Sequence, residues 1–254
     1  MCERGSFAHF IVIEMVENMR RQSKKNPWRN TRNDFRMPWN KIYSWMIMIS
    51  MPLALLTMSP NVIMRSGAFY SYFLSKTGVV KEIPYAIEME DVRDTFKDFM
   101  WHKNSVFNLR EQDAAYMPQM VFTKVDSQIM SFARNITDVL AVICLLAIVV
   151  AIIAAVKLFA AKKRELLFDA YKRAMIITGL GLVLCSIVIF VPTLRTGIFR
   201  GGFGDTFPPG DVLIQIFDAG FPIYYGVGCI IVTIVLALGI TYLMKEFVAN
   251  RKLF

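Results

Sequence analysis

The stretch ITDVLAVICLLAIVVAIIAAVKLF, residues 136–159, constrains the fold more than any other part of the chain. It is almost uninterrupted in apolar character and long enough to cross a bilayer as a helix, which takes about 20 residues. Three further stretches are similar, although the first has a shorter apolar core: 42–58, 174–192 and 223–244. Hydrophobic residues make up 55% of the chain. We therefore expect an all-α membrane protein with four transmembrane helices.

The distribution of Lys and Arg predicts the orientation of these spans. Basic residues concentrate in 1–41, 160–173 and 245–254, and such segments remain on the cytoplasmic side of a membrane. The chain is therefore expected to be a multi-pass cell-membrane protein with a basic cytoplasmic N-terminal arm, a cytoplasmic loop and a cytoplasmic C-terminal tail. The segments 59–135 and 193–222 would then lie outside the cytoplasm.

The basic arm accounts for much of the formal net charge of +9. Basic groups close to a span are attracted to anionic lipid of the inner leaflet. Within the arm, FAHFIVIEMVENMRR (7–21) places apolar residues near one helical face, which favours either an interfacial helix or a partly ordered tail with a short helix. No basic nucleic-acid-binding module is recognisable, so nucleic acid is not an expected partner.

The extracytoplasmic segment 60–135 is long enough for a small cap domain. Acidic residues at 88–91 precede Val92, Phe96 and Met100 at helical spacing, which predicts a helix. The stretch FTKVDSQIMSFARN, 122–135, leads directly into the span 136–159. We expect it to extend that span outward as one helix.

Residue types that carry chemistry are scarce. The two histidines, His9 and His102, would lie on opposite sides of the membrane. Neither a zinc-binding cluster nor a nucleophile motif occurs, so we expect no metal and no cofactor. Residues of the spans that favour packing over ligand binding are Cys144, Cys185, Cys229, Gly179, Gly181, Gly226 and Gly228.

The connector RTGIFRGGFGDTFPPGDVLIQIF, 195–217, is rich in glycine. It lacks the spacing of a nucleotide-binding loop, and no strand precedes it. On the expected topology it connects the third and fourth spans outside the cytoplasm.

Two pieces of the sequence carry a family resemblance. FTKVDSQIM (122–130) and LRTGIFRGGFGDTFPPGDVLI (194–214) match motifs of a bacterial family. The matching residues are Phe122, Thr123, Asp126, Met130, Phe199, Gly201, Gly202, Pro208, Asp211, Leu213 and Ile214. Over residues 40–245 the chain resembles the four-span lipoprotein intramolecular transacylases (Lit).

The resemblance implies an activity at the outer leaflet. Members of the family move a fatty acyl chain within a diacylated lipoprotein, from the glyceryl sn-2 oxygen to the amino group of the N-terminal cysteine. Two motif histidines are expected to serve this transfer. In this chain the corresponding positions hold Ile129 and Arg195, and neither side chain acts as a base near neutral pH.

Three functions therefore remain open. The chain is a degenerate homologue that binds membrane lipid or a bacterial lipoprotein at the outer leaflet, an active acyltransferase with a non-standard base, or a membrane scaffold or accessory subunit. No catalytic residue is identified, and the candidates are Asp126, His102 and Arg195. Arg195 would bind a phosphate or carboxylate near Asp126 and Asp211, or extend to lipid headgroups. The candidate lipid-binding or motif positions are Phe122, Met130, Arg195, Gly201, Gly202 and Asp211.

Overall fold

The computed structural model describes residues 39–83, 87–109, 121–194 and 211–246. The chain divides into two units, Met1–Ile42 and Tyr43–Phe254. The expected interfacial helix at 7–21 lies outside the described residues, so it stays a prediction. All regular structure within the described ranges is helical.

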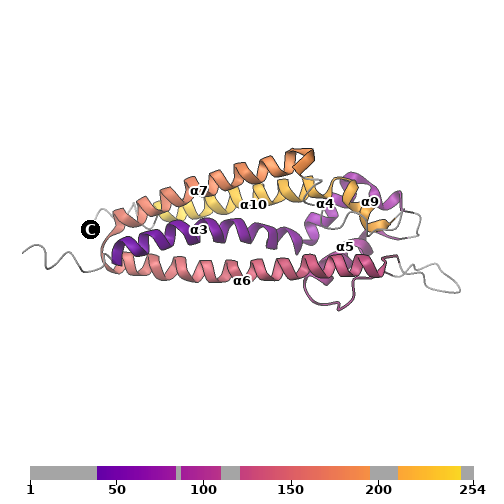
Figure 1. The fold of residues 1–254 in the computed structure, drawn as a ribbon, viewed down its shortest axis with the longest axis horizontal. Helices are drawn as coiled ribbons and strands as arrows, with labels where there is room; N and C mark the ends of the chain where they lie inside the picture. The colour runs from indigo at the N-terminus through magenta and orange to yellow at the C-terminus, as the bar shows by residue number, and fades with distance from the viewer. Residues whose placement is uncertain (1–38, 84–86, 110–120, 195–210, 247–254) are drawn as a thin grey trace, which may run out of the picture. The chain divides into compact units, whose positions relative to one another are not determined.

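Four long helices run side by side (Figure 1). They are α3 (Trp39–Met64), α6 (Lys124–Ala160), α7 (Arg164–Phe190) and α10 (Phe221–Met244). Each is long and apolar enough to cross a membrane. The four predicted spans and the all-α membrane class are thereby confirmed.

Helix α3 is the most enclosed of the four. In its most apolar stretch 44% of residues are buried, against 17% or less in the other three helices. The Cys144 thiol of α6 lies 3.6 Å from the Ala54 carbonyl oxygen of α3, and Thr233 of α10 donates to Ser59 of α3 at 2.9 Å. Helix α3 therefore packs against its neighbours, whereas much of α6, α7 and α10 faces outward.

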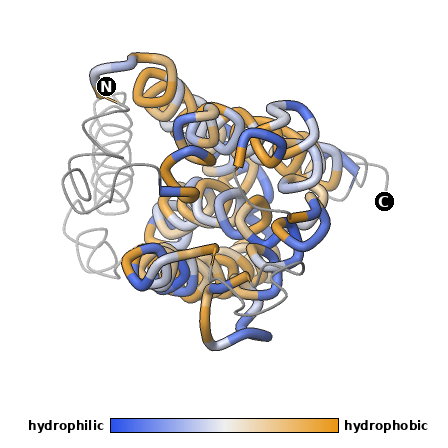
Figure 2. Tube along the Cα trace, turned by 90° about the vertical axis from the view of Figure 1, so that its right-hand side faces the viewer, coloured by the Kyte–Doolittle hydropathy of each residue, from blue (hydrophilic) through white to orange (hydrophobic). Residues whose placement is uncertain are grey.

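The outward faces are apolar, as a bilayer requires. Large hydrophobic side chains that are 55% exposed or more recur along the three outer helices: Val139, Val142, Leu145, Ile152, Ile176, Leu180, Val183, Val235 and Leu238. Figure 2 views the helices from one end, and hydrophobic residues recur along them among hydrophilic ones. Exposed apolar stripes of this extent mark contact with lipid.

Glycines set the closest approaches between the spans. A Cβ at Gly226 of α10 would lie 2.4 Å from Ile189 Cδ1 of α7. A Cβ at Gly181 of α7 would lie 2.9 Å from Leu56 of α3, and a Cβ at Gly228 of α10 would lie 3.1 Å from Ile63 of α3. The predicted packing role is confirmed for these three glycines. A Cβ at Gly179 would meet nothing within 4 Å, so no close contact requires that glycine.

Two helices extend beyond the apolar segments seen in the sequence. Helix α3 continues past Pro60 to Met64, and the Asn61 amide, donating to the Thr57 carbonyl at 3.0 Å, helps to satisfy backbone near the proline. Helix α7 begins at Arg164, so most of the expected loop 160–173 is helical. Buried Leu167, Ala170 and Tyr171 give this segment an inward helical face.

The remaining helices lie at the end of the bundle where α3 ends and α10 begins. We call this part the cap. It comprises α4 (Gly67–Thr77), the 3₁₀ turn η1 (Val79–Lys81), α5 (Met89–Met100), α9 (Val212–Asp218) and the first turns of α6. Helix α5 covers the region in which acidic residues and apolar spacing predicted a helix. Helix α6 runs from the cap into its span without a break, as predicted.

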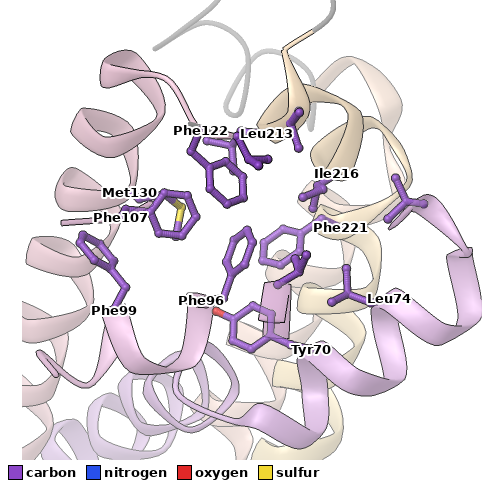
Figure 3. Close-up of a cluster of buried hydrophobic side chains, with 14 of the residues drawn as sticks. Tyr70, Leu74, Phe96, Phe99, Phe107, Phe122, Met130, Leu213, Ile216 and Phe221 are labelled. Atoms are coloured by element: carbon purple, nitrogen blue, oxygen red, sulfur yellow. The ribbon is translucent and has the colours of Figure 1, made fainter. Parts of the chain in front are cut away.

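One hydrophobic core unites the cap (Figure 3). Its buried residues come from every helix of the cap and from the start of α10, and they include Tyr70, Phe73, Phe96, Phe99, Phe107, Phe122, Met130, Leu213, Ile216 and Phe221. The ring centroids of Phe107 and Phe122 lie 4.5 Å apart, and those of Phe96 and Phe107 lie 5.0 Å apart. This aromatic packing fixes the positions of the polar residues described next.

Candidate functional site

The first motif forms the N-terminal cap of α6. The Thr123 side chain accepts a hydrogen bond from the Asp126 backbone N–H at 3.2 Å. The Asp126 carboxylate accepts one from the Thr123 backbone N–H at 2.8 Å. This reciprocal capping box satisfies two N–H groups that a helix start otherwise leaves without partners. The sequence FTKVD therefore begins a helix at Lys124 for a local reason.

The second motif begins another helix beside the first. Asp211 Oδ1 accepts hydrogen bonds from the backbone N–H groups of Leu213 at 2.9 Å and Ile214 at 3.4 Å, and so caps α9. Its other oxygen lies 3.5 Å from the Thr123 hydroxyl, which donates to it. The starts of α6 and α9 therefore meet, and they bring the two carboxylates into one place.

Asp126 is the more deeply buried of these two acids. Its side chain is fully buried, and Oδ1 has no hydrogen-bond partner among the described residues. Burial, the main cause, together with the charge of Asp211 and hydrogen bonding to it, raises the pKa of Asp126 to about 6, while the bonds from Thr123 oppose this rise. The Asp126 carboxyl therefore binds a proton in weakly acidic solution more readily than an ordinary aspartate does.

The apolar motif residues are part of the cap core. Phe122 is 2% exposed and Met130 is 1% exposed, and both pack in the aromatic cluster. Ile129, which the sequence resemblance aligns with a motif histidine, is also buried in this core. These three side chains are therefore buried packing residues of the cap core.

His102 lies in a different part of the cap. It follows α5 in a left-handed conformation, with φ of 57°, and its Nε2 lies 2.8 Å from Asp138 Oδ2. Asp138 and Asp126 are twelve positions apart on α6, which corresponds to about 18 Å along the helix axis. The two candidate bases are therefore not brought together.

Arg195, Gly201 and Gly202 fall in the segment 195–210, outside the described residues. Their proposed roles stay predictions. Of the three residues expected to converge, the structure brings Asp126 and Asp211 together, and Arg195 is not described.

Sequence reasoning missed an ion-pair cluster at the base of the cap. Arg65 Nη2 lies 2.6 Å from Asp138 Oδ1, and Trp101 Nε1 donates to the Arg65 carbonyl oxygen at 2.9 Å. The sequence does carry a signal for this cluster. A carboxylate at position 138, close to the start of an apolar span, needs a partner, and Arg65 follows the end of the preceding span.

No group of three or more metal-ligating side chains occurs within the described ranges. The three cysteines found there, Cys144, Cys185 and Cys229, are free thiols. The polar features of the described cap that bear on function are the Asp126–Asp211 pair and the Arg65–Asp138–His102 cluster.

Comparison with known proteins identifies a shared fold. No family model and no curated protein sequence matches the chain. The lipoprotein intramolecular transacylase Lit from Bacillus cereus superposes with a TM-score of 0.61 at 10% identity, over 82% of this chain and 96% of that one. A variant with one histidine replaced by alanine gives 0.64 at 12% identity, over 85% and 96%. A variant with arginine at that histidine gives 0.63 at 11% identity, over 91% and 98%.

Proposed function

We propose that the chain binds a membrane lipid or a bacterial lipoprotein at the outer leaflet, using a transacylase-like fold without the family's pair of motif histidines. The similar solved structures are those of an enzyme that acts on lipoproteins, as its name states. The observation that carries the proposal is the separation of the candidate bases. Buried Asp126 lies about 18 Å along α6 from Asp138, the residue that exposed His102 contacts.

Acyl transfer sets geometric requirements that make this separation important. A general base must come within hydrogen-bond reach of the attacking group, and an oxyanion needs donors aimed at it. Asp126 is fully buried, and its bonded oxygen caps α6 through Thr123. His102 is 54% exposed and faces Asp138. Neither arrangement presents a base together with an oxyanion donor.

The proposed orientation follows from the basic residues at the opposite end of the bundle. The turn between α6 and α7 contains Lys162 and Lys163, and Arg164 begins α7. With these residues at the cytoplasmic face, the cap and its carboxylate pair lie at the outer leaflet. A lipoprotein anchored in that leaflet would meet the cap directly.

One observation favours a second candidate function, an active acyltransferase with Asp126 as the base. A buried carboxyl that has a raised pKa and an oxygen without a partner among the described residues is a feature of catalytic sites as well as of structural ones. This activity would require Asp126 to become accessible when substrate binds.

The test uses the full chain in detergent with a synthetic diacylated lipopeptide. Native mass spectrometry measures binding of this lipopeptide and of the same peptide without acyl chains, and chromatography measures any lyso product. We expect saturable binding of the acylated form alone, with no lyso product. Absence of binding contradicts the proposal. Formation of lyso product that is lost in Asp126→Asn or His102→Ala instead establishes the transferase.

A further inference from the structure

We propose that Arg134 holds the phosphate of a phospholipid at the base of the cap, in a headgroup site separate from the Asp126–Asp211 pair. The site lies on α6 beside the loop that follows α5. This inference goes beyond the proposed function, because the lipid bound here is a component of the surrounding leaflet and not a lipoprotein.

Arg134 lies on the outward face of α6. Arg134, Asp138, Val142 and Leu145 follow one another at intervals of four, four and three residues, so they share one face of α6. Val142 is 58% exposed and Leu145 is 63% exposed. The face is therefore apolar and outward along the span, and it becomes charged about 6 Å above Val142, at Asp138, with Arg134 about 12 Å above Val142. This is the order of acyl chains and headgroup in a lipid.

The charges near Arg134 are not balanced by the described carboxylates. The carboxylate of Asp138 is shared by Arg65 at 2.6 Å and His102 at 2.8 Å. Arg134 forms no ion pair with a described residue; its Nη1 donates to the Asn104 carbonyl oxygen at 3.4 Å. Arg65 thus compensates the Asp138 carboxylate, and no described carboxylate pairs with Arg134. One positive charge remains for an anion from outside.

The neighbouring acids that the structure describes do not remove this charge. Asp98, the nearest acid on α5 to this loop, is paired with Lys103 at 3.2 Å and Lys97 at 3.8 Å. The guanidinium of Arg134 is itself fixed in place, with its carbon 4.2 Å from the centre of the Phe99 ring. A fixed guanidinium offers paired N–H donors in the geometry that phosphate oxygens accept.

Exposed apolar side chains lie on the loop beside Arg134. Trp101 is 54% exposed and Val106 is 59% exposed, on the same short loop that supplies the Asn104 carbonyl. Tryptophan with a bonded N–H and an exposed ring is typical of the membrane–water interface. The contact between Arg134 and Asn104 joins this loop to the outward face of α6, so we expect the anion to be attached to acyl chains and not to be a soluble phosphate.

The experiment compares Arg134→Gln with Lys124→Gln. Lys124 is exposed and lies on the same helix at its first residue, so its substitution removes an equal charge elsewhere. Native mass spectrometry of the delipidated full chain in detergent measures binding of phosphatidylglycerol and of diacylglycerol with the same acyl chains. We expect one tight phosphatidylglycerol site, weakened about tenfold in Arg134→Gln and unchanged in Lys124→Gln.

Three results would overturn the proposal: equal affinity in wild type and Arg134→Gln, equal binding of diacylglycerol, or displacement of the lipid by millimolar inorganic phosphate. Should Arg134→Gln not fold, Arg134→Lys decides instead. It retains the charge without the paired donors, so weaker binding supports the site, and unchanged binding contradicts it. Lipopeptide binding is measured separately, and its loss or retention does not alter this outcome.

Discussion

The contact between α7 and α10 at Gly226 allows a sharp test of how the spans pack. A Cβ at this position would lie 2.4 Å from Ile189 Cδ1 and 2.6 Å from its Cγ1, well inside van der Waals contact. Gly226→Ala therefore requires Ile189 or a whole helix to move. Inserting a methyl group into a packed interior costs about 1–3 kcal/mol. This corresponds to a decrease in Tm of about 2–12 °C for a chain of this size.

Gly239 provides the matched control within the same helix. A Cβ there would meet nothing within 4 Å, so Gly239→Ala should leave Tm unchanged or raise it slightly through helix propensity. Thermal unfolding in detergent, followed by tryptophan fluorescence, measures both variants. In a double-mutant cycle, Ile189→Ala should remove most of the cost of Gly226→Ala. Equal Tm values for the two glycine variants, or strict additivity in the cycle, would refute the packing argument.

Two further predictions concern the cap. The raised pKa of Asp126 means that the folded chain binds a proton that the unfolded chain has released between about pH 4 and 6, so this group lowers the unfolding free energy as pH rises through that window. Asp126→Asn should abolish this part of the pH dependence of Tm; an unchanged profile would show that Asp126 does not titrate there. Phe96 is 2% exposed in the aromatic core, so Phe96→Ala should lower the free energy of unfolding by about 3–5 kcal/mol. Tyr72→Ala, at a side chain 60% exposed, should cost less than about 1 kcal/mol, and similar losses for both would contradict the core assignment.

The parts of the fold that depend on local pattern were predictable from the sequence. The span 136–159 is one long apolar run, and a single segment in lipid satisfies its backbone hydrogen bonds by forming a helix. The helix at 89–100 follows from acidic residues ahead of an apolar stripe. The start of α6 at Thr123 is a capping box within five residues of sequence. In each case the interactions that decide the structure lie within one or two helical turns.

The parts that were not predictable depend on distant contacts. Helix α7 begins at Arg164 because Leu167 and Tyr171 are buried against other elements, which a count of charges does not reveal. Asp126 and Asp211 are distant in sequence, and only the packing of the cap places them together. The Arg65–Asp138 pair could have been anticipated, since a charge near a span requires a partner. Its geometry, and the participation of His102, could not.

The continuity of α6 has a consequence for how the chain tolerates change. Its 37 residues extend over about 55 Å, well beyond the roughly 30 Å of hydrocarbon in a bilayer. Because no loop interrupts it, inserting or deleting one residue between Asp126 and Asp138 would turn one end about 100° relative to the other. The Thr123–Asp211 contact at one end and the Arg65–Asp138 ion pair further along could then not both be kept. Natural variants of this chain should accept substitutions along this stretch far more readily than any change in its length.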